Sequence, residues 1–165
     1  MTPSYVHGAD VFGSWLTDLE TGTPPVRYAL PSPFTSLDLR PGRLMLFGGP
    51  PGTGKTSALL QIGVELLREN DSAKLLIANV EMSVGNLVER IVARLAGVPL
   101  TKLANRETTD DERGRIRLAF DALRPFAARL AFLNAPYSLQ HVAKPADAFG
   151  ANVVIVDYLQ RFAVG

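Results

Sequence analysis

The chain carries the stretch GPPGTGKT at residues 49–56, and this stretch decides how the rest of the sequence is interpreted. It satisfies the pattern G-x-x-x-x-G-K-[ST] at every fixed position. Glycines let the backbone of such a loop curl, so that successive N–H groups point at phosphate oxygens. A helix that begins at the loop adds the positive end of its dipole. We therefore expect a phosphate-binding loop made of Gly49, Pro50, Pro51, Gly52, Thr53, Gly54, Lys55, Thr56 and Ser57.

Two side chains of this loop have a specific chemistry. Lys55 would bring a positive charge to the β- and γ-phosphates of a nucleotide, and the hydroxyl of Thr56 would ligate Mg²⁺. The alternative is a glycine-rich turn that only connects a strand to a helix. The flanks favour the nucleotide site, because RLMLF at residues 43–47 predicts a short buried strand and residues 55–70 predict a helix.

The rest of the chain alternates apolar strands with amphipathic helices. Further strands are predicted at residues 74–80, 129–134 and 152–158. Ser83 is expected to cap a helix that Gly97 stops, and residues 109–112 match a capping box. Pro125 should end or kink that second helix, and Pro145 should weaken a third that begins at Ser138. This alternation predicts an α/β fold with a parallel sheet and helices on both faces.

The N-terminal part of the sequence differs from this pattern. Residues 10–20 predict one short helix, with apolar residues at helical spacing. Residues 21–33 carry four prolines without periodicity and indicate an extended linker. We therefore expect residues 1–33 to form an arm and residues 34–165 to form the folded core.

Two acidic residues follow predicted strands. Asp157 ends the last strand, so its carboxylate would emerge at the edge of the sheet where α/β proteins bind ligands, and it could hold magnesium through water. The alternative is an ordinary polar residue at a strand end. Glu81 directly follows the strand at 74–80 and could polarise an attacking water. An acid before a helix also favours the helix dipole, and spacing alone does not separate these two interpretations.

Composition sets the broad class of protein. With 165 residues, 47% hydrophobic and 20% charged, the chain suits one globular domain. A net charge of +1 gives no basic field that would indicate nucleic-acid binding. The absence of cysteine excludes disulfides and thiolate metal sites. No run of about 18 apolar residues and no signal pattern is present, so a cytoplasmic protein without a membrane partner is expected.

Acidic residues alternate with the arginines of residues 106–129, which favours a solvated helix face over a DNA-binding surface.

Three motifs in order carry a resemblance to a known family. They are GGPPGTGKT at residues 48–56, NVEMS with VERIVARLAGV at residues 79–98, and VVIVDYLQ at residues 153–160. Together they resemble the C-terminal ATPase domain of DnaB-type replicative helicases, which belong to the RecA-like P-loop ATPases. The resemblance covers roughly residues 33–162, and residues 32–47 resemble the family's lead-in to the P-loop.

The resemblance implies a role for each site residue. Lys55 and Thr56 would contact phosphate and magnesium, Glu81 would be the catalytic base, and Asp157 would be the second magnesium-coordinating acid. ATP and Mg²⁺ are the implied cofactors. In the full-length family, ATP hydrolysis drives movement on single-stranded DNA and strand separation by a homo-oligomer, a hexamer. The helix at residues 10–20 would be a linker that packs on the neighbouring subunit.

The family pattern also continues beyond the Asp157 strand, known as the Walker B strand. In the family, the next strand lies in the sheet between the P-loop strand and the Asp157 strand. It is followed in the sequence by DNA-contacting loops and by an arginine that reaches the nucleotide site of the adjacent subunit. We therefore expect a RecA-like fold that is incomplete at its C-terminus, with the two flanking strands closed up or another chain between them. Two alternatives stay open: a nucleotide-binding fragment with little turnover, and another RecA-like ATPase of recombinase or clock type.

Overall fold

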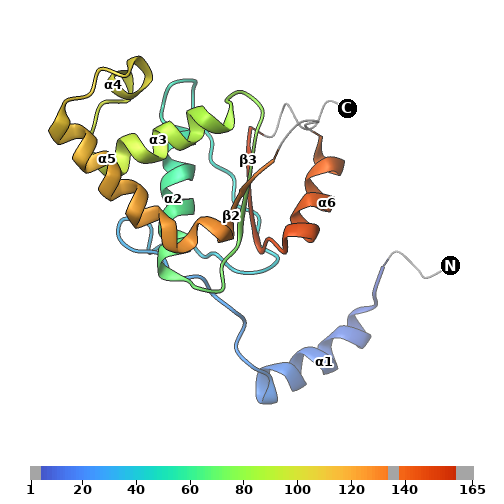
Figure 1. The fold of residues 1–165 in the computed structure, drawn as a ribbon. Helices are drawn as coiled ribbons and strands as arrows, with labels where there is room; N and C mark the ends of the chain where they lie inside the picture. Colours follow the sequence, from blue (N-terminus) through green and yellow to red (C-terminus); the bar gives the residue numbers. More distant parts are fainter. Residues whose placement is uncertain (1–4, 134–137, 159–165) are drawn as a thin grey trace.

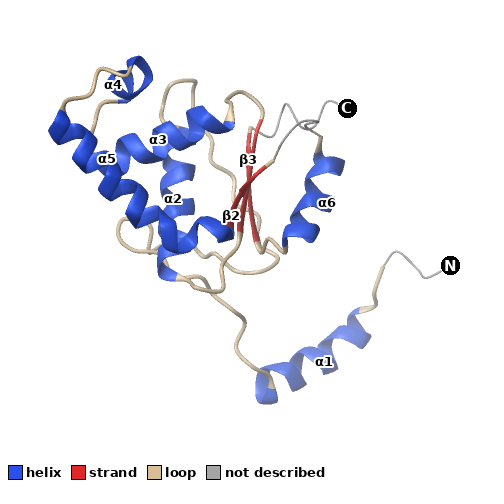
Figure 2. Cartoon of the chain, viewed as in Figure 1, coloured by secondary structure: helices blue, strands red, loops and turns tan. Residues whose placement is uncertain are grey.

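In the part of the chain that the structure describes, the sheet has three parallel strands. The computed structural model describes residues 5–133 and 138–158. Its strands are β1 (Leu75–Asn79), β2 (Leu130–Phe132) and β3 (Val153–Asp157), in the order β2-β1-β3 (Figures 1 and 2). Every residue of the central strand β1 is buried, as expected for a strand with neighbours on both sides and helices on both faces. The predicted α/β fold class is confirmed.

Helices cover both faces of the sheet (Figure 1). On one face, α2 (Lys55–Glu69) and α3 (Val84–Ala96) pack against Leu75 and Ile77 of β1. On the other face, α6 (Leu139–Phe149) packs against Leu76 and Ala78. Alternate side chains of a strand point to opposite faces, so each face requires its own apolar set. This requirement explains why the strand sequences are apolar without alternation.

Two further helices, α4 (Leu100–Asn105) and α5 (Asp110–Leu123), pack on α3. A 3₁₀ helix, η1 (Arg124–Arg129), follows α5 and packs against α2 and β2. The predicted caps are present: the Ser83 side chain accepts a hydrogen bond from the Asn86 N–H, and residues 109–112 form a capping box. Pro125 lies in the first turn of η1, where the α-helix has already ended. The short helix α4 was not predicted, and α6 continues through Pro145.

The predicted strand at residues 43–47 is wrong. These residues take part in no strand, and Leu44 and Leu46 are 83% and 75% exposed. A strand exists only when a neighbour satisfies its backbone groups. The nearest candidate is the outer edge of β3, but a cavity of about 510 Å³ separates that edge from residues 43–47. Within residues 5–133 and 138–158, nothing pairs with this edge of β3, so the two flanking segments have not closed up.

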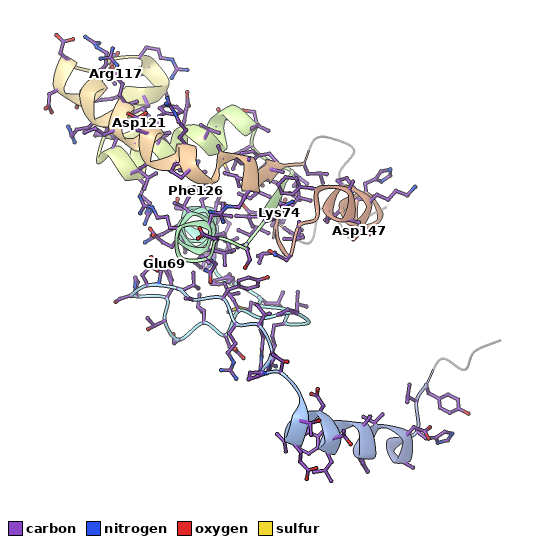
Figure 3. The ribbon with its side chains drawn as sticks, turned by 60° about the horizontal axis from the view of Figure 1, so that its bottom comes forward. Glu69, Lys74, Arg117, Asp121, Phe126 and Asp147 are labelled. Atoms are coloured by element: carbon purple, nitrogen blue, oxygen red, sulfur yellow. The ribbon has the colours of Figure 1, made fainter. Side chains whose placement is uncertain are left out.

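The N-terminal helix lies apart from the packed body. The helix α1 (Gly8–Thr21) is confirmed, and none of its residues is buried (Figures 1 and 3). Packing into the core begins within the predicted arm, since Tyr28 and Leu30 are buried and Tyr28 forms an isolated bridge with Leu39. Among the described residues, no helix combines the length and apolar character needed to cross a membrane.

Candidate nucleotide-binding site

The glycine-rich loop adopts a backbone that favours glycine at two positions. Gly52 and Gly54 have φ values of 79° and 85°, in the left-handed region that other residues rarely occupy. Gly54 is also the N-cap of α2 and supplies no side chain to cap it. The first N–H groups of α2 therefore have neither an intrahelical partner nor a cap, and they are available to a ligand.

The charges around the start of α2 favour an anion. The first turn of α2 holds no acidic residue, so no side chain of the helix itself offsets the positive end of its dipole. The Nζ of Lys55 donates hydrogen bonds to the carbonyl oxygens of Gly49 and Pro50, both at 2.8 Å. These contacts hold the ammonium group against the loop. Uncapped N–H groups, a helix N-terminus and a lysine beside the loop together make a site suited to phosphate.

Thr56 and Asp157 meet beside this loop although they lie far apart in the sequence. The Oγ1 of Thr56 donates a hydrogen bond of 2.7 Å to the Oδ2 of Asp157. Asp157 is only 8% exposed, because it ends β3 next to the start of α2. The predicted phosphate-loop hydroxyl and the predicted acid thus lie within one hydrogen bond of each other.

The donor set at this contact fits a magnesium ion. Hydroxyl and carboxylate oxygens are hard ligands of the kind Mg²⁺ prefers. No group of three or more His, Cys, Asp or Glu side chains suited to a metal occurs in the described parts of the chain.

Asn79 is a site residue that the sequence analysis missed. It ends β1 opposite Asp157 and is only 3% exposed. Its Nδ2 donates to the Oδ2 of Asp157 at 2.7 Å, and its Oδ1 accepts from the N–H groups of Glu81 and Met82 at 2.9 and 2.8 Å. The available signal was a polar residue that ends a continuous apolar strand at the ligand-binding edge of the sheet.

Glu81 lies at the same edge of the sheet as Asp157. The N–H of Val80 donates to the carbonyl oxygen of Asp157 at 3.1 Å, which joins the two strand ends. Glu81 follows Val80, and its side chain is exposed at the rim. The structure therefore brings the loop, Asp157 and the backbone of Glu81 to one side of the sheet, although no strand precedes the loop.

The cavity next to β3 is a separate feature from the phosphate loop. We call it the edge cavity; it is lined by residues 40–49 and 152–158 and by the face of α2 that holds Leu59, Ile62, Gly63 and Leu66. It follows the outer edge of β3, and only its end at Gly49, Lys55 and Asp157 reaches the loop. A nucleotide phosphate bound at the loop would touch that end alone.

The arginines of residues 106–129 are mostly engaged in ion pairs. Arg106 pairs with Glu89 at 2.7 Å, and Arg115 pairs with Asp111 at 3.2 Å. Figure 3 shows Arg117 and Asp121 on the outer part of α5, away from Phe126, which is buried. This pairing supports the interpretation of a solvated helix face.

Comparisons with known proteins agree with this geometry. The chain is 25% identical over 141 residues to a probable plasmid replicative DNA helicase of Chlamydia trachomatis serovar L2, and the match covers 80% of this chain and 31% of that protein. A protein of the same description from Chlamydia trachomatis matches equally. This chain therefore spans about a third of the length of the curated relatives it matches.

A solved structure and a family model complete the comparison. The solved structure, which is described as an ATPase domain, matches with a TM-score of 0.64 and 18% identity, covering 94% of this chain and 58% of that one. At this identity the match shows the fold alone, which is that of a RecA-like ATPase domain. The family model for the DnaB-like helicase C terminal domain matches residues 30–165. The chain therefore belongs to the DnaB-like helicase C-terminal domain family.

Proposed function

We propose that this chain binds ATP with Mg²⁺ at residues 49–57 and hydrolyses it, as the ATPase part of a DnaB-like replicative DNA helicase. The observation that carries the proposal is the 2.7 Å contact between Thr56 and Asp157, which joins the phosphate loop to the acid at the end of β3. The names of the relatives, which describe replicative helicases, support the choice of process.

The backbone of the loop and the side chains of Lys55 and Thr56 have separate roles in binding the triphosphate. The N–H groups at the start of α2 donate to phosphate oxygens, and Lys55 moves its ammonium group from the Gly49 and Pro50 carbonyls to the β- and γ-phosphates. The hydroxyl of Thr56 and the carboxylate of Asp157 would hold the magnesium ion. When bound, the metal neutralises charge that develops on the phosphates.

Glu81 acts as the general base. Its carboxylate accepts a proton from the water that attacks the γ-phosphate, a contribution of about 10²–10⁴-fold to the rate in enzymes of known mechanism. The position of its backbone at the rim beside Asp157 supports this role, because the attacking water must lie next to the phosphate and not behind the loop.

We also propose single-stranded DNA and a second copy of the chain as partners, within a hexamer for the whole protein. The helix α1 exposes Val11, Phe12, Trp15, Leu16 and Leu19. Its charged residues are all acidic (Asp10, Asp18 and Glu20). A groove of about 290 Å³ between α2 and α3 is lined by apolar side chains together with Ser57, Gln61 and two arginines, Arg90 and Arg94. An acidic amphipathic helix suits such a groove on a neighbouring subunit.

A second candidate function is nucleotide binding with little turnover. The observation that favours it is the edge cavity, which within the described residues leaves β3 without a neighbour on its outer side. Catalysis by P-loop ATPases depends on groups that complete the site from neighbouring segments, and an arginine supplied in trans is worth about 10³–10⁵ in rate. Binding and turnover must therefore be measured separately.

Two variants test the proposal. Lys55→Ala is expected to abolish magnesium-dependent ATP binding in calorimetry, whereas Glu81→Gln keeps ATP binding and loses hydrolysis. Lys74→Ala is the matched control, because Lys74 precedes β1 at the opposite end of the sheet. Equal ATP affinity for the wild type and Lys55→Ala would refute the site. ATP binding without hydrolysis by the wild type would favour the second candidate.

A further inference from the structure

We propose that Asn79 is a positioning residue that holds the carboxylate of Asp157 and the backbone of Glu81 in a fixed relation, and so links magnesium binding to the placement of the base. The inference rests on the proposed function, because it assigns Asn79 a task at the same ATP site. It concerns a neutral side chain whose hydrogen bonds go to Asp157, Glu81 and Met82.

The Asn79 amide has one orientation that satisfies its surroundings. Its oxygen faces two N–H donors, those of Glu81 and Met82, and its nitrogen faces the carboxylate of Asp157. A flipped amide would set nitrogen against N–H and oxygen against carboxylate. Because Asn79 is 3% exposed, water has little access to replace a lost bond. Three contacts therefore fix this side chain in place.

The contact with Asp157 determines which carboxylate oxygen remains for the metal. Oδ2 accepts hydrogen bonds from both Asn79 and Thr56, each at 2.7 Å. Such bonds to a carboxylate are charge-assisted and stronger than neutral ones. Because Thr56 donates its proton to Asp157, the lone pairs of its hydroxyl would be available to a magnesium ion. Within residues 5–133 and 138–158, the side-chain hydrogen bonds of the Asp157 carboxylate fall on Oδ2, which would leave Oδ1 for the metal site. Groups that hydrogen-bond a metal ligand in this way orient the ligand and tune metal affinity.

The contacts with Glu81 and Met82 act on the base. An Asn side chain that accepts from the N–H groups two and three residues later fixes a turn, as in Asx-turns. Here the turn lies between the end of β1 and Ser83, the N-cap of α3. Glu81 is therefore held between two anchored points. If Asn79 were removed, the hydrogen bonds to the N–H groups of Glu81 and Met82 would be lost. The neighbouring backbone bond from the Val80 N–H to the Asp157 carbonyl oxygen would remain.

The chain offers a matched control for this residue. Asn152 precedes β3 at the opposite end of the sheet, and it also joins two segments through both ends of its amide. Its Oδ1 accepts from the N–H of Lys74, and its Nδ2 donates to the carbonyl oxygen of Ser72, both at 2.9 Å. Asn152→Ala therefore removes a comparable structural amide far from the loop.

The test measures how ATP affinity depends on magnesium, by calorimetry with the full chain. In Asn79→Ala, the Mg²⁺ concentration that gives half of the affinity gain is expected to rise about 10–100-fold, the usual effect of removing a group that orients a metal ligand. ATP affinity without Mg²⁺ should stay unchanged, and Asn152→Ala should leave both quantities unchanged. The same Mg²⁺ dependence in Asn79→Ala and the wild type, or an equal shift in Asn152→Ala, would overturn the inference.

A second variant covers the case in which Asn79→Ala fails to fold. In Asn79→Ser, the hydroxyl can still accept from a nearby N–H but is too short to reach Asp157, so the turn is kept and the carboxylate contact is lost. It should therefore show the raised Mg²⁺ requirement with near wild-type stability, and a wild-type requirement would overturn the inference. If the wild type itself binds no ATP with Mg²⁺, the proposed function fails; if only the variants behave as wild type, this inference alone fails.

Discussion

The substitution Gly63→Ala tests how closely α2 packs on the sheet. Gly63 is buried in the middle of α2, and a Cβ there would lie 2.6 Å from Cδ2 of Leu75 and 3.3 Å from Cδ1 of Ile155. Leu75 is only 1% exposed, so its side chain has little room to move. Overpacking of this kind costs about 1–3 kcal/mol. Because alanine has a higher helix propensity than glycine, the substitution also stabilises the helix by up to about 1 kcal/mol.

The expected result is therefore a loss of about 0–2 kcal/mol in the free energy of unfolding for Gly63→Ala. Gly114→Ala is the matched control: Gly114 lies within α5, and a Cβ there would meet nothing within 4 Å. This control should gain about 0.5–1 kcal/mol from helix propensity alone. Urea denaturation of both variants and the wild type, followed by circular dichroism, gives the comparison. If Gly63→Ala stabilised the protein as much as Gly114→Ala, the close approach of α2 to β1 would be refuted.

Three further outcomes are expected. The hydrogen bond from Lys102 and that from the Thr109 N–H lower the pKa of Glu112 from 4.5 to about 2. The ionised Glu112 carboxylate therefore contributes fully to the free energy of unfolding above about pH 4.5, and this contribution is lost as the pH falls toward 2. The unfolding free energies of the wild type and Glu112→Gln should accordingly converge between pH 4.5 and about 2. Arg129→Ala should lower the free energy of unfolding by about 2 kcal/mol in urea denaturation, because the Arg129 guanidinium donates to the carbonyl oxygens of Leu67, Asn70 and Ala73 at the end of α2 and just after it. Arg129→Lys should recover only part of this loss. Trp15→Ala should leave the unfolding free energy within about 0.5 kcal/mol, since Trp15 is 61% exposed, but should reduce self-association in analytical ultracentrifugation.

Local signals explain why most of the elements could be predicted. Ser83 and Thr109 accept the capping bonds that their sequence positions indicated, and Gly97 ends α3 with a φ of 60°. These features depend on residues within one helical turn of each other, so neighbouring residues decide them. The same holds for Gly52 and Gly54, whose left-handed backbone shapes the phosphate loop.

The misassigned strand and the missed residue depend on contacts between distant segments. Residues 43–47 have the composition of a buried strand, but a strand also needs a partner, and the edge cavity lies where the partner would be. Asn79 was passed over because its importance comes from Asp157, 78 residues later in the chain. No property of the sequence around Asn79 states which strand lies beside it.

The sequence by itself determined the family motifs, the glycine-rich loop with its left-handed glycines, and the side of the sheet on which Asp157 must emerge, because a parallel strand carries its last residue to a known edge. The tertiary structure alone decided that Thr56 and Asn79 share one carboxylate oxygen of Asp157. The order β2-β1-β3 places the ends of β1 and β3 side by side, and the close packing of α2 on the sheet brings the loop to them. Hydrogen bonds of 2.7 Å require that alignment of three separate elements, and alignment follows from packing, not from the order of residues along the chain.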